Sequence, residues 1–242
     1  NLKGGRINKI AQPENDELLI TGKGANGQKR LLLSASASLP LIYFTDKNTV
    51  YVNLYISNEA QIDLNEGTTK IQIESDLTNT GHIVLKVTPD EGSTNNLAIR
   101  IPDYVKAYTI RKDGALLEHQ DICQAYLTIG GISKQTEIVI DFEVPARFVR
   151  ANPNVREDVG KTALVKGPLV YCLEETDNGE NLPGIFVDTK QEVREMFEPE
   201  LLGGVTTLRF KGKKLNVDTW KDGALYDSRE MAFEEVDLKA VP

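Results

Sequence analysis

The feature that most constrains the fold of this chain is an alternation of apolar and polar residues with a period of two. Residues 50–56 predict a half-buried strand, because successive side chains of a strand point to opposite faces. One face would carry Tyr51, Asn53 and Tyr55, and the other Val50, Val52, Leu54 and Ile56. The same alternation recurs in residues 60–64, 69–74, 82–87, 96–101, 107–111, 125–129 and 136–142.

Turn signals that contain glycine separate these segments at the spacing typical of an antiparallel sandwich. Asp113 followed by Gly114 is the strongest two-residue hairpin signal in the chain. Beyond residue 145 the alternation continues with longer loops between the segments. The pattern predicts an all-β protein made of two antiparallel β-sandwiches in tandem, residues 41–145 and 146–242.

The amino-terminal part, residues 1–40, is predicted to be a short irregular segment. Residues 7–10 and 17–21 fit edge strands, and residues 28–39 fit either a small-residue helix or an extended segment. We favour the helix, which Pro40 would end. The chain starts without an initiator methionine or a signal-peptide pattern, so we expect it to begin inside a longer or processed protein.

The charge of the chain restricts its partners. A net charge of −8 argues against a nucleic-acid backbone or an anionic membrane as a partner, and suits neutral sugars or small molecules. No apolar run approaches the roughly 20 residues needed to cross a bilayer. We therefore expect neither nucleic acid nor a membrane as a partner, and the compartment stays undetermined.

The residues that bind metals in proteins are scarce. Cys123, Cys172, His82 and His119 do not stand at the spacing of zinc ligands, so we predict no metal and no cofactor in this chain. Each cysteine is predicted to be a small buried apolar residue.

Carboxylate pairs offer a candidate catalytic site. Residues two apart on a strand share a face about 7 Å apart, which fits an inverting glycosidase. The alternative, which we favour, is the solvated polar face of a sandwich. The pairs are Glu74 with Asp76, Asp141 with Glu143, and the adjacent Glu174 with Glu175.

Aromatic residues offer a candidate sugar-binding site. Tyr51 and Tyr55 share one predicted strand face and Trp220 lies in a polar segment, so these rings could stack on sugar faces. A second candidate consists of arginines near Asn152 that could grip a carboxylate. We expect those arginines, Arg147, Arg150 and Arg156, to pair instead with Glu157, Asp158 or backbone carbonyls.

Several ordered blocks of this sequence resemble glycoside hydrolase family 127, the β-L-arabinofuranosidase family. The central block runs from Val144 to Glu174 and contains Asn152-Pro153-Asn154 and Lys166-Gly167-Pro168. The resemblance covers residues from about Ser38 to the end. The other blocks are Ala37-Ser38-Leu39-Pro40 with Tyr43, residues 48–56, Ile99-Arg100-Ile101-Pro102, residues 200–205 and residues 238–242.

The resemblance implies β-sandwich domains that follow a catalytic (α/α)6 barrel. In the family, a Cys-Cys-Pro motif supplies a cysteine that is both zinc ligand and nucleophile, shortly before the Ser-Leu-Pro block. Residues 22–33 contain no cysteine here, and a retaining mechanism needs a nucleophile and a proton donor about 5 Å apart. The resemblance therefore implies a non-catalytic C-terminal region, with zinc expected in the family's catalytic domain.

The partner implied by this resemblance is the missing catalytic barrel, whose substrates would be terminal β-L-arabinofuranosides of plant-type glycans. The β region would cover the barrel, shape the rim of its cleft or form a homodimer contact. Two alternatives remain open: an independent carbohydrate-binding module, and a truncated product without function.

Overall fold

The computed structural model describes residues 6–11, 17–24, 27–35, 40–46, 48–118, 122–123, 125–219, 225–226, 228 and 230–242. These residues confirm the predicted all-β class, since the helical elements are only three or four residues long. The chain divides into two compact units, Asn1–Glu143 and Val144–Pro242. No helix within the described ranges is long and apolar enough to cross a membrane.

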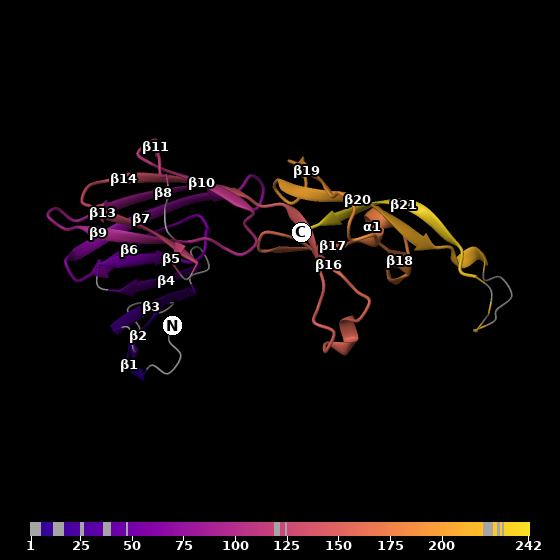
Figure 1. The fold of residues 1–242 in the computed structure, drawn as a ribbon, viewed down its shortest axis with the longest axis horizontal. Coiled ribbons are helices and arrows are strands. Elements are labelled where there is room, and N and C mark those ends of the chain that lie inside the picture. Colours follow the sequence, from indigo (N-terminus) through magenta and orange to yellow (C-terminus); the bar gives the residue numbers. More distant parts are fainter. Residues whose placement is uncertain are drawn as a thin grey trace. The chain divides into compact units, whose positions relative to one another are not determined.

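The first unit contains two sheets, drawn from indigo to rose in Figure 1. One has eight strands in the order β1-β2-β3-β4-β5-β9-β13-β12, and the other six in the order β11-β10-β14-β8-β7-β6. The first sheet consists of β1 (Arg6–Ala11), β2 (Glu17–Gly24), β3 (Gly27–Ala35), β4 (Pro40–Asp46), β5 (Thr49–Val52), β9 (Asn95–Arg100), β13 (Tyr126–Ile132) and β12 (Ile122–Cys123). The second consists of β11 (Ala115–Leu116), β10 (Ala107–Lys112), β14 (Thr136–Glu143), β8 (His82–Pro89), β7 (Gly67–Asp76) and β6 (Asn58–Leu64).

The core of the first unit comes from the inner faces of its sheets, as the alternating pattern predicts. Asn95 on β9 donates a buried hydrogen bond to Thr69 on β7, which joins the two sheets. Neighbouring strands are antiparallel except β5 and β9, which run parallel. The fully buried apolar side chains include Val52, Leu97, Ile99 and Leu127 from one sheet and Ile71, Ile83, Leu85, Ile138 and Ile140 from the other.

The predicted hairpin at Asp113 and Gly114 is confirmed. Both residues have positive φ, 49° and 80°, as a two-residue turn between twisted strands requires. The turn joins β10 to β11, with Lys112 opposite Ala115.

The helix predicted over residues 28–39 is wrong. Residues 27–35 form β3, which pairs with β2 on one side and β4 on the other. Strands on both sides supply backbone hydrogen bonds, and such long-range pairing overrides a weak local helix preference. The strands predicted at residues 7–10 and 17–21 are confirmed as parts of β1 and β2.

The prediction of which side chains of residues 53–56 point to the core is also wrong. Strand β5 ends at Val52, and the chain then crosses to β6 in the other sheet. Asn53 and Tyr55 are buried, whereas Leu54 and Ile56 are 42% and 44% exposed. Leaving the sheet shifts the alternation by one residue, and a one-residue shift exchanges the two faces.

The second unit contains a seven-stranded antiparallel sheet in the order β15-β16-β17-β21-β20-β18, with β19 also paired to β20. Its strands are β15 (Ala146–Val149), β16 (Ala163–Lys166), β17 (Leu169–Leu173), β18 (Ile185–Phe186), β19 (Arg194–Glu198), β20 (Val205–Leu215) and β21 (Phe233–Val241). Short helical elements lie between them: η1 (Arg156–Asp158), α1 (Glu175–Asn178), η2 (Leu182–Gly184) and η3 (Val217–Thr219).

The long strand β20 organises the second unit. Its first half pairs with β19, its end pairs with β18, and β21 runs along its other edge. Gly212 on β20 allows a close approach, since a Cβ there would lie 2.5 Å from Cδ1 of Leu238. The core cluster consists of Leu164, Tyr171, Leu208, Phe210, Leu238 and Ala240.

Candidate functional site

The predicted aromatic platform is not assembled on one exposed face. Tyr55 is only 6% exposed, its hydroxyl donates a hydrogen bond to the Arg100 carbonyl, and its ring packs edge-on against Phe142. Burial raises the pKa of Tyr55 well above its usual value. The Tyr55 ring therefore belongs to the core and offers no face to a sugar.

Tyr51 lies half-buried on β5. Its ring meets that of Tyr126 edge-on, with the centroids 5.2 Å apart, and the Tyr126 hydroxyl donates a hydrogen bond to Asn53. Trp220 lies outside the described residues. A sugar-binding role for Tyr51 and Trp220 stays a prediction.

The second unit contains an open groove with a volume of about 970 Å³. One wall is a loop that we call the arm, residues 150–162 between β15 and β16, which projects from the sheet in Figure 1. The other wall runs from β17 through η2 to Thr189, and includes Tyr171 and Phe186. Phe148 and Phe210 line the groove and pack edge-on with their centroids 5.6 Å apart.

The arm is held in shape by its own hydrogen bonds. The backbone amide of Asn154 donates to Oδ1 of Asn152 over 2.9 Å, and the Thr162 hydroxyl donates to the Val149 carbonyl over 2.9 Å. Across the groove, Nη2 of Arg150 donates to Oγ1 of Thr189 over 2.5 Å. Within the described residues, Arg147, Arg150 and Arg156 form no ion pair with Glu157 or Asp158, and Arg150 donates to Thr189 instead.

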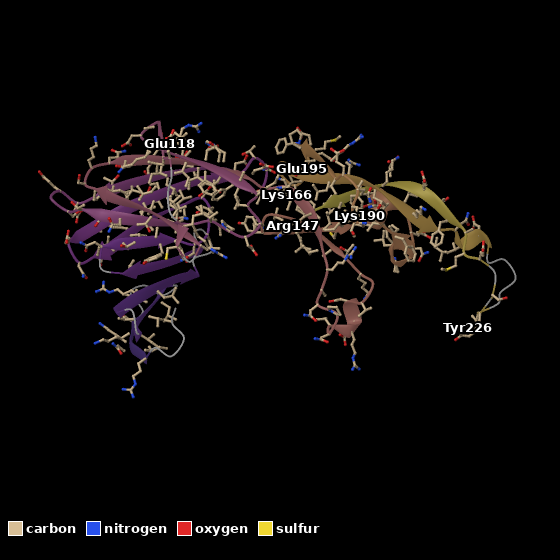
Figure 2. All side chains as sticks on the ribbon, in the orientation of Figure 1. Glu118, Arg147, Lys166, Lys190, Glu195 and Tyr226 are labelled. Atoms are coloured by element: carbon tan, nitrogen blue, oxygen red, sulfur yellow. The ribbon has the colours of Figure 1, made fainter. Side chains whose placement is uncertain are left out.

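An ion pair between a buried lysine and a partly exposed glutamate connects distant strands of the second unit. Nζ of Lys166, on β16, lies 3.3 Å from Oε2 of Glu195, on β19, and Figure 2 shows the two side chains close together. The Lys166 side chain is 3% exposed and that of Glu195 is 35% exposed. Oε1 of Glu195 also accepts a hydrogen bond from the backbone amide of Ala146, over 3.2 Å. Glu195 therefore links β19 to β15 and to β16. In the sheet order, β17, β21 and β20 separate β19 from these two strands.

Glu198, on the same strand, also binds side chains of neighbouring strands. Its Oε1 accepts hydrogen bonds of 2.8 Å from Thr207 and from Arg209, and its Oε2 lies 3.4 Å from Nζ of Lys239. The Thr207 hydrogen bond, followed by those from Arg209 and Lys239, lowers the pKa of the Glu198 carboxyl. Lys239 reaches Asp177 as well, over 3.3 Å.

Three members of the predicted carboxylate pairs lie in exposed ion pairs, and a fourth accepts hydrogen bonds. Asp141 binds Nδ1 of His82 over 2.7 Å and Arg111 over 3.1 Å, and the hydrogen bond with His82 is the main cause that lowers the Asp141 pKa. Glu74 pairs with Lys86 and Glu143 with Lys106. Asp76 accepts hydrogen bonds from Asn79 and Thr80.

The two cysteines were predicted to be buried, and this is wrong, because both are exposed. Cys172 follows the buried Tyr171 on β17 and so points to the opposite face. Among the described residues, no group of three or more histidine, cysteine, aspartate or glutamate side chains could hold a metal ion.

Family models account for both units. Residues 49–145 match the model described as the "Beta-L-arabinofuranosidase, GH127 middle domain", and residues 146–242 match the "Glycoside hydrolase family 127 C-terminal domain". The chain belongs to glycoside hydrolase family 127. Residues 1–53 also match a model for the NFACT N-terminal and middle domains, which covers only the amino-terminal segment and shows no family for the chain.

This chain matches the following members of family 127 over only part of their length. The "Non-reducing end beta-L-arabinofuranosidase" of Bifidobacterium longum subsp. longum is 30% identical over 225 residues, 85% of this chain and 32% of the relative. A crystal structure of a GH127 beta-L-arabinofuranosidase from Geobacillus stearothermophilus T6 has a TM-score of 0.72 at 30% identity, over 83% of this chain and 32% of that protein. A GH127 beta-arabinofuranosidase structure has a TM-score of 0.70 at 27% identity, over 83% of this chain and 33% of that protein. The chain thus spans about a third of the length of these relatives.

Sequence reasoning missed both the groove and the Lys166–Glu195 pair. One signal for Lys166 exists, because it stands two residues after the buried Leu164 and so occupies an inward position of β16. No local signal marks Glu195, and the groove combines segments that are distant in the sequence.

Proposed function

We propose that this family 127 chain is the non-catalytic C-terminal β region of a hydrolase that resembles β-L-arabinofuranosidases, and that it supports an (α/α)6 catalytic barrel. In this proposal the barrel is its partner and carries zinc and catalysis. Terminal β-L-arabinofuranosides of plant-type glycans are the substrates of the whole enzyme.

The observation that carries the proposal is the pair of domain matches. One model for the middle domain and one for the C-terminal domain account for residues 49–242. A relative named as a non-reducing end beta-L-arabinofuranosidase is 30% identical to the chain over about a third of its own length.

The chemistry of the described residues supports a structural role. One predicted carboxylate pair is engaged by neighbouring side chains: Asp141 by His82 and Arg111, and Glu143 by Lys106. A general acid at neutral pH needs a raised pKa, whereas the pKa of Asp141 is lowered. These groups suit ion pairing on a surface.

A surface for the barrel is offered by the segment that follows β5. Leu54 and Ile56 are 42% and 44% exposed, although Asn53 and Tyr55 beside them are buried. Apolar side chains that a monomer leaves in water gain free energy when a partner covers them. The same surface could serve a homodimer contact, which is the alternative for this role.

The test of the proposal is hydrolysis of an aryl β-L-arabinofuranoside by the chain of 242 residues, with and without added zinc. We expect no turnover under either condition. Steady turnover that survives Cys123→Ala and Cys172→Ala together would refute the non-catalytic reading and direct attention back to the carboxylates. Turnover that those substitutions abolish would refute it as well and would point to a thiolate nucleophile.

A further inference from the structure

The groove between the arm and β18 has the size of a ligand site. Its volume of about 970 Å³ falls in the range of roughly 300–1,000 Å³ that small-molecule pockets occupy. The groove lies wholly within the second unit, and none of the proposed structural role depends on it.

Two aromatic rings of the groove are fixed by edge-on contacts with other rings. Phe186 is 52% exposed, and its ring packs edge-on against Phe233 at 5.3 Å with an interplanar angle of 88°. Phe148 is held in the same way by Phe210. A ring that is exposed yet fixed in orientation loses little entropy when it packs against the C–H face of a ligand.

The polar groups of the groove include both donors and an acceptor. Arg150 is positioned by Thr189, and Lys161 and Asp158 line the same groove. Within the ranges that the structure describes, none of these three charged side chains has an ion-pair partner within 4 Å. Their hydrogen-bonding capacity is available to a ligand.

We propose that this groove binds a short neutral saccharide. A hydroxyl group both donates and accepts hydrogen bonds, so a sugar can use the Arg150 and Lys161 donors together with the Asp158 acceptor. An apolar ligand would bury these charges without partners. A polyanion could pair with Arg150 and Lys161 but would leave the Asp158 carboxylate facing like charge, whereas hydroxyl groups can pair with all three side chains.

The test is a titration of the isotope-labelled full chain with arabinotriose and with xylotriose, followed by amide chemical shifts. We expect a Kd of about 1 mM or tighter for at least one of them, with shifts concentrated in residues 150–162 and 182–189. The substitutions Phe186→Ala and Arg150→Met should each weaken binding at least about tenfold.

Matched controls exist in the same unit. Phe197, on β19, is 55% exposed, and Arg147 lies exposed on β15; neither lines the groove. Phe197→Ala and Arg147→Met should leave saccharide binding unchanged. Circular dichroism would confirm that each variant is folded, and the shift map of the unsubstituted chain decides the location of the site even if one variant is not.

Three results would overturn the proposal. One is the absence of binding by both trisaccharides in the millimolar range, and another is binding that Phe186→Ala and Arg150→Met leave intact. The third is tighter binding of trigalacturonate, which would identify the groove as an anion site. All three are independent of the hydrolysis assay, so failure of this proposal is distinguishable from failure of the proposed function.

Discussion

Replacement of Glu195 by glutamine should destabilise the second unit. The Lys166 side chain is 3% exposed, and its Nζ lies 3.3 Å from this carboxylate. Removing one partner of a fully buried ion pair costs about 3–5 kcal/mol, because the remaining buried charge loses its counter-charge. Here the cost is smaller, since Glu195 is 35% exposed and Lys166 keeps a further interaction. We expect a loss of about 1–2 kcal/mol in the free energy of unfolding for Glu195→Gln.

Substitution of Glu195 and substitution of Lys166 should lower the free energy of unfolding by different amounts. Glutamine can still accept the Ala146 hydrogen bond, so Glu195→Gln isolates the loss of charge. Lys166→Met keeps the volume of the buried side chain and leaves a carboxylate that solvent reaches, and it should cost less than about 1 kcal/mol. The double variant should then be about as stable as Lys166→Met alone, since the buried ammonium that Glu195 pairs with is gone.

The assay is equilibrium unfolding in guanidinium chloride followed by the amide NMR signals of β16, β19 and β20, strands of the second unit. Glu192→Gln, at an exposed position three residues earlier, is the matched control and should change stability by less than about 0.5 kcal/mol. If Glu195→Gln behaves like this control, or if Lys166→Met costs as much as Glu195→Gln, the buried-charge reasoning is refuted.

Two further predictions concern the first unit. Gly81→Ala should lower the free energy of unfolding by at least about 2 kcal/mol, because φ is +80° and a Cβ would lie 2.0 Å from the carbonyl oxygen of Phe142. The control Gly92→Ala, at a similar φ of +82° with open space around it, should lower it by about 1 kcal/mol. Equal losses of stability in thermal unfolding would contradict the steric argument. His82→Ala should raise the pKa of Asp141, because the hydrogen bond with His82 is the main cause of the lowered Asp141 pKa. Because a lowered carboxyl pKa stabilises the fold above its unfolded value of about 3.9 and this contribution is lost on acidification, the variant should lose less stability below about pH 4. An unchanged Asp141 titration in carbon-detected NMR would show that other groups set its pKa.

The amino-acid sequence by itself determined the class of the fold and most of its strands. The alternation in residues 69–74, 82–87 and 136–142 reappears as the alternating burial of β7, β8 and β14, because side-chain direction along a strand is a local property of the backbone. The hairpin at Asp113 and Gly114 was predictable for the same reason, since the turn depends on two residues that tolerate positive φ.

Only the tertiary structure decided which segments meet. Residues 27–35 became a strand because β2 and β4 lie on either side of them, and Leu54 became exposed because the chain leaves its sheet at Val52. The Lys166–Glu195 pair and the groove join segments that the sequence separates by tens of residues. Such contacts depend on long-range strand pairing and on the path of the loops, which the local preferences of single residues do not encode.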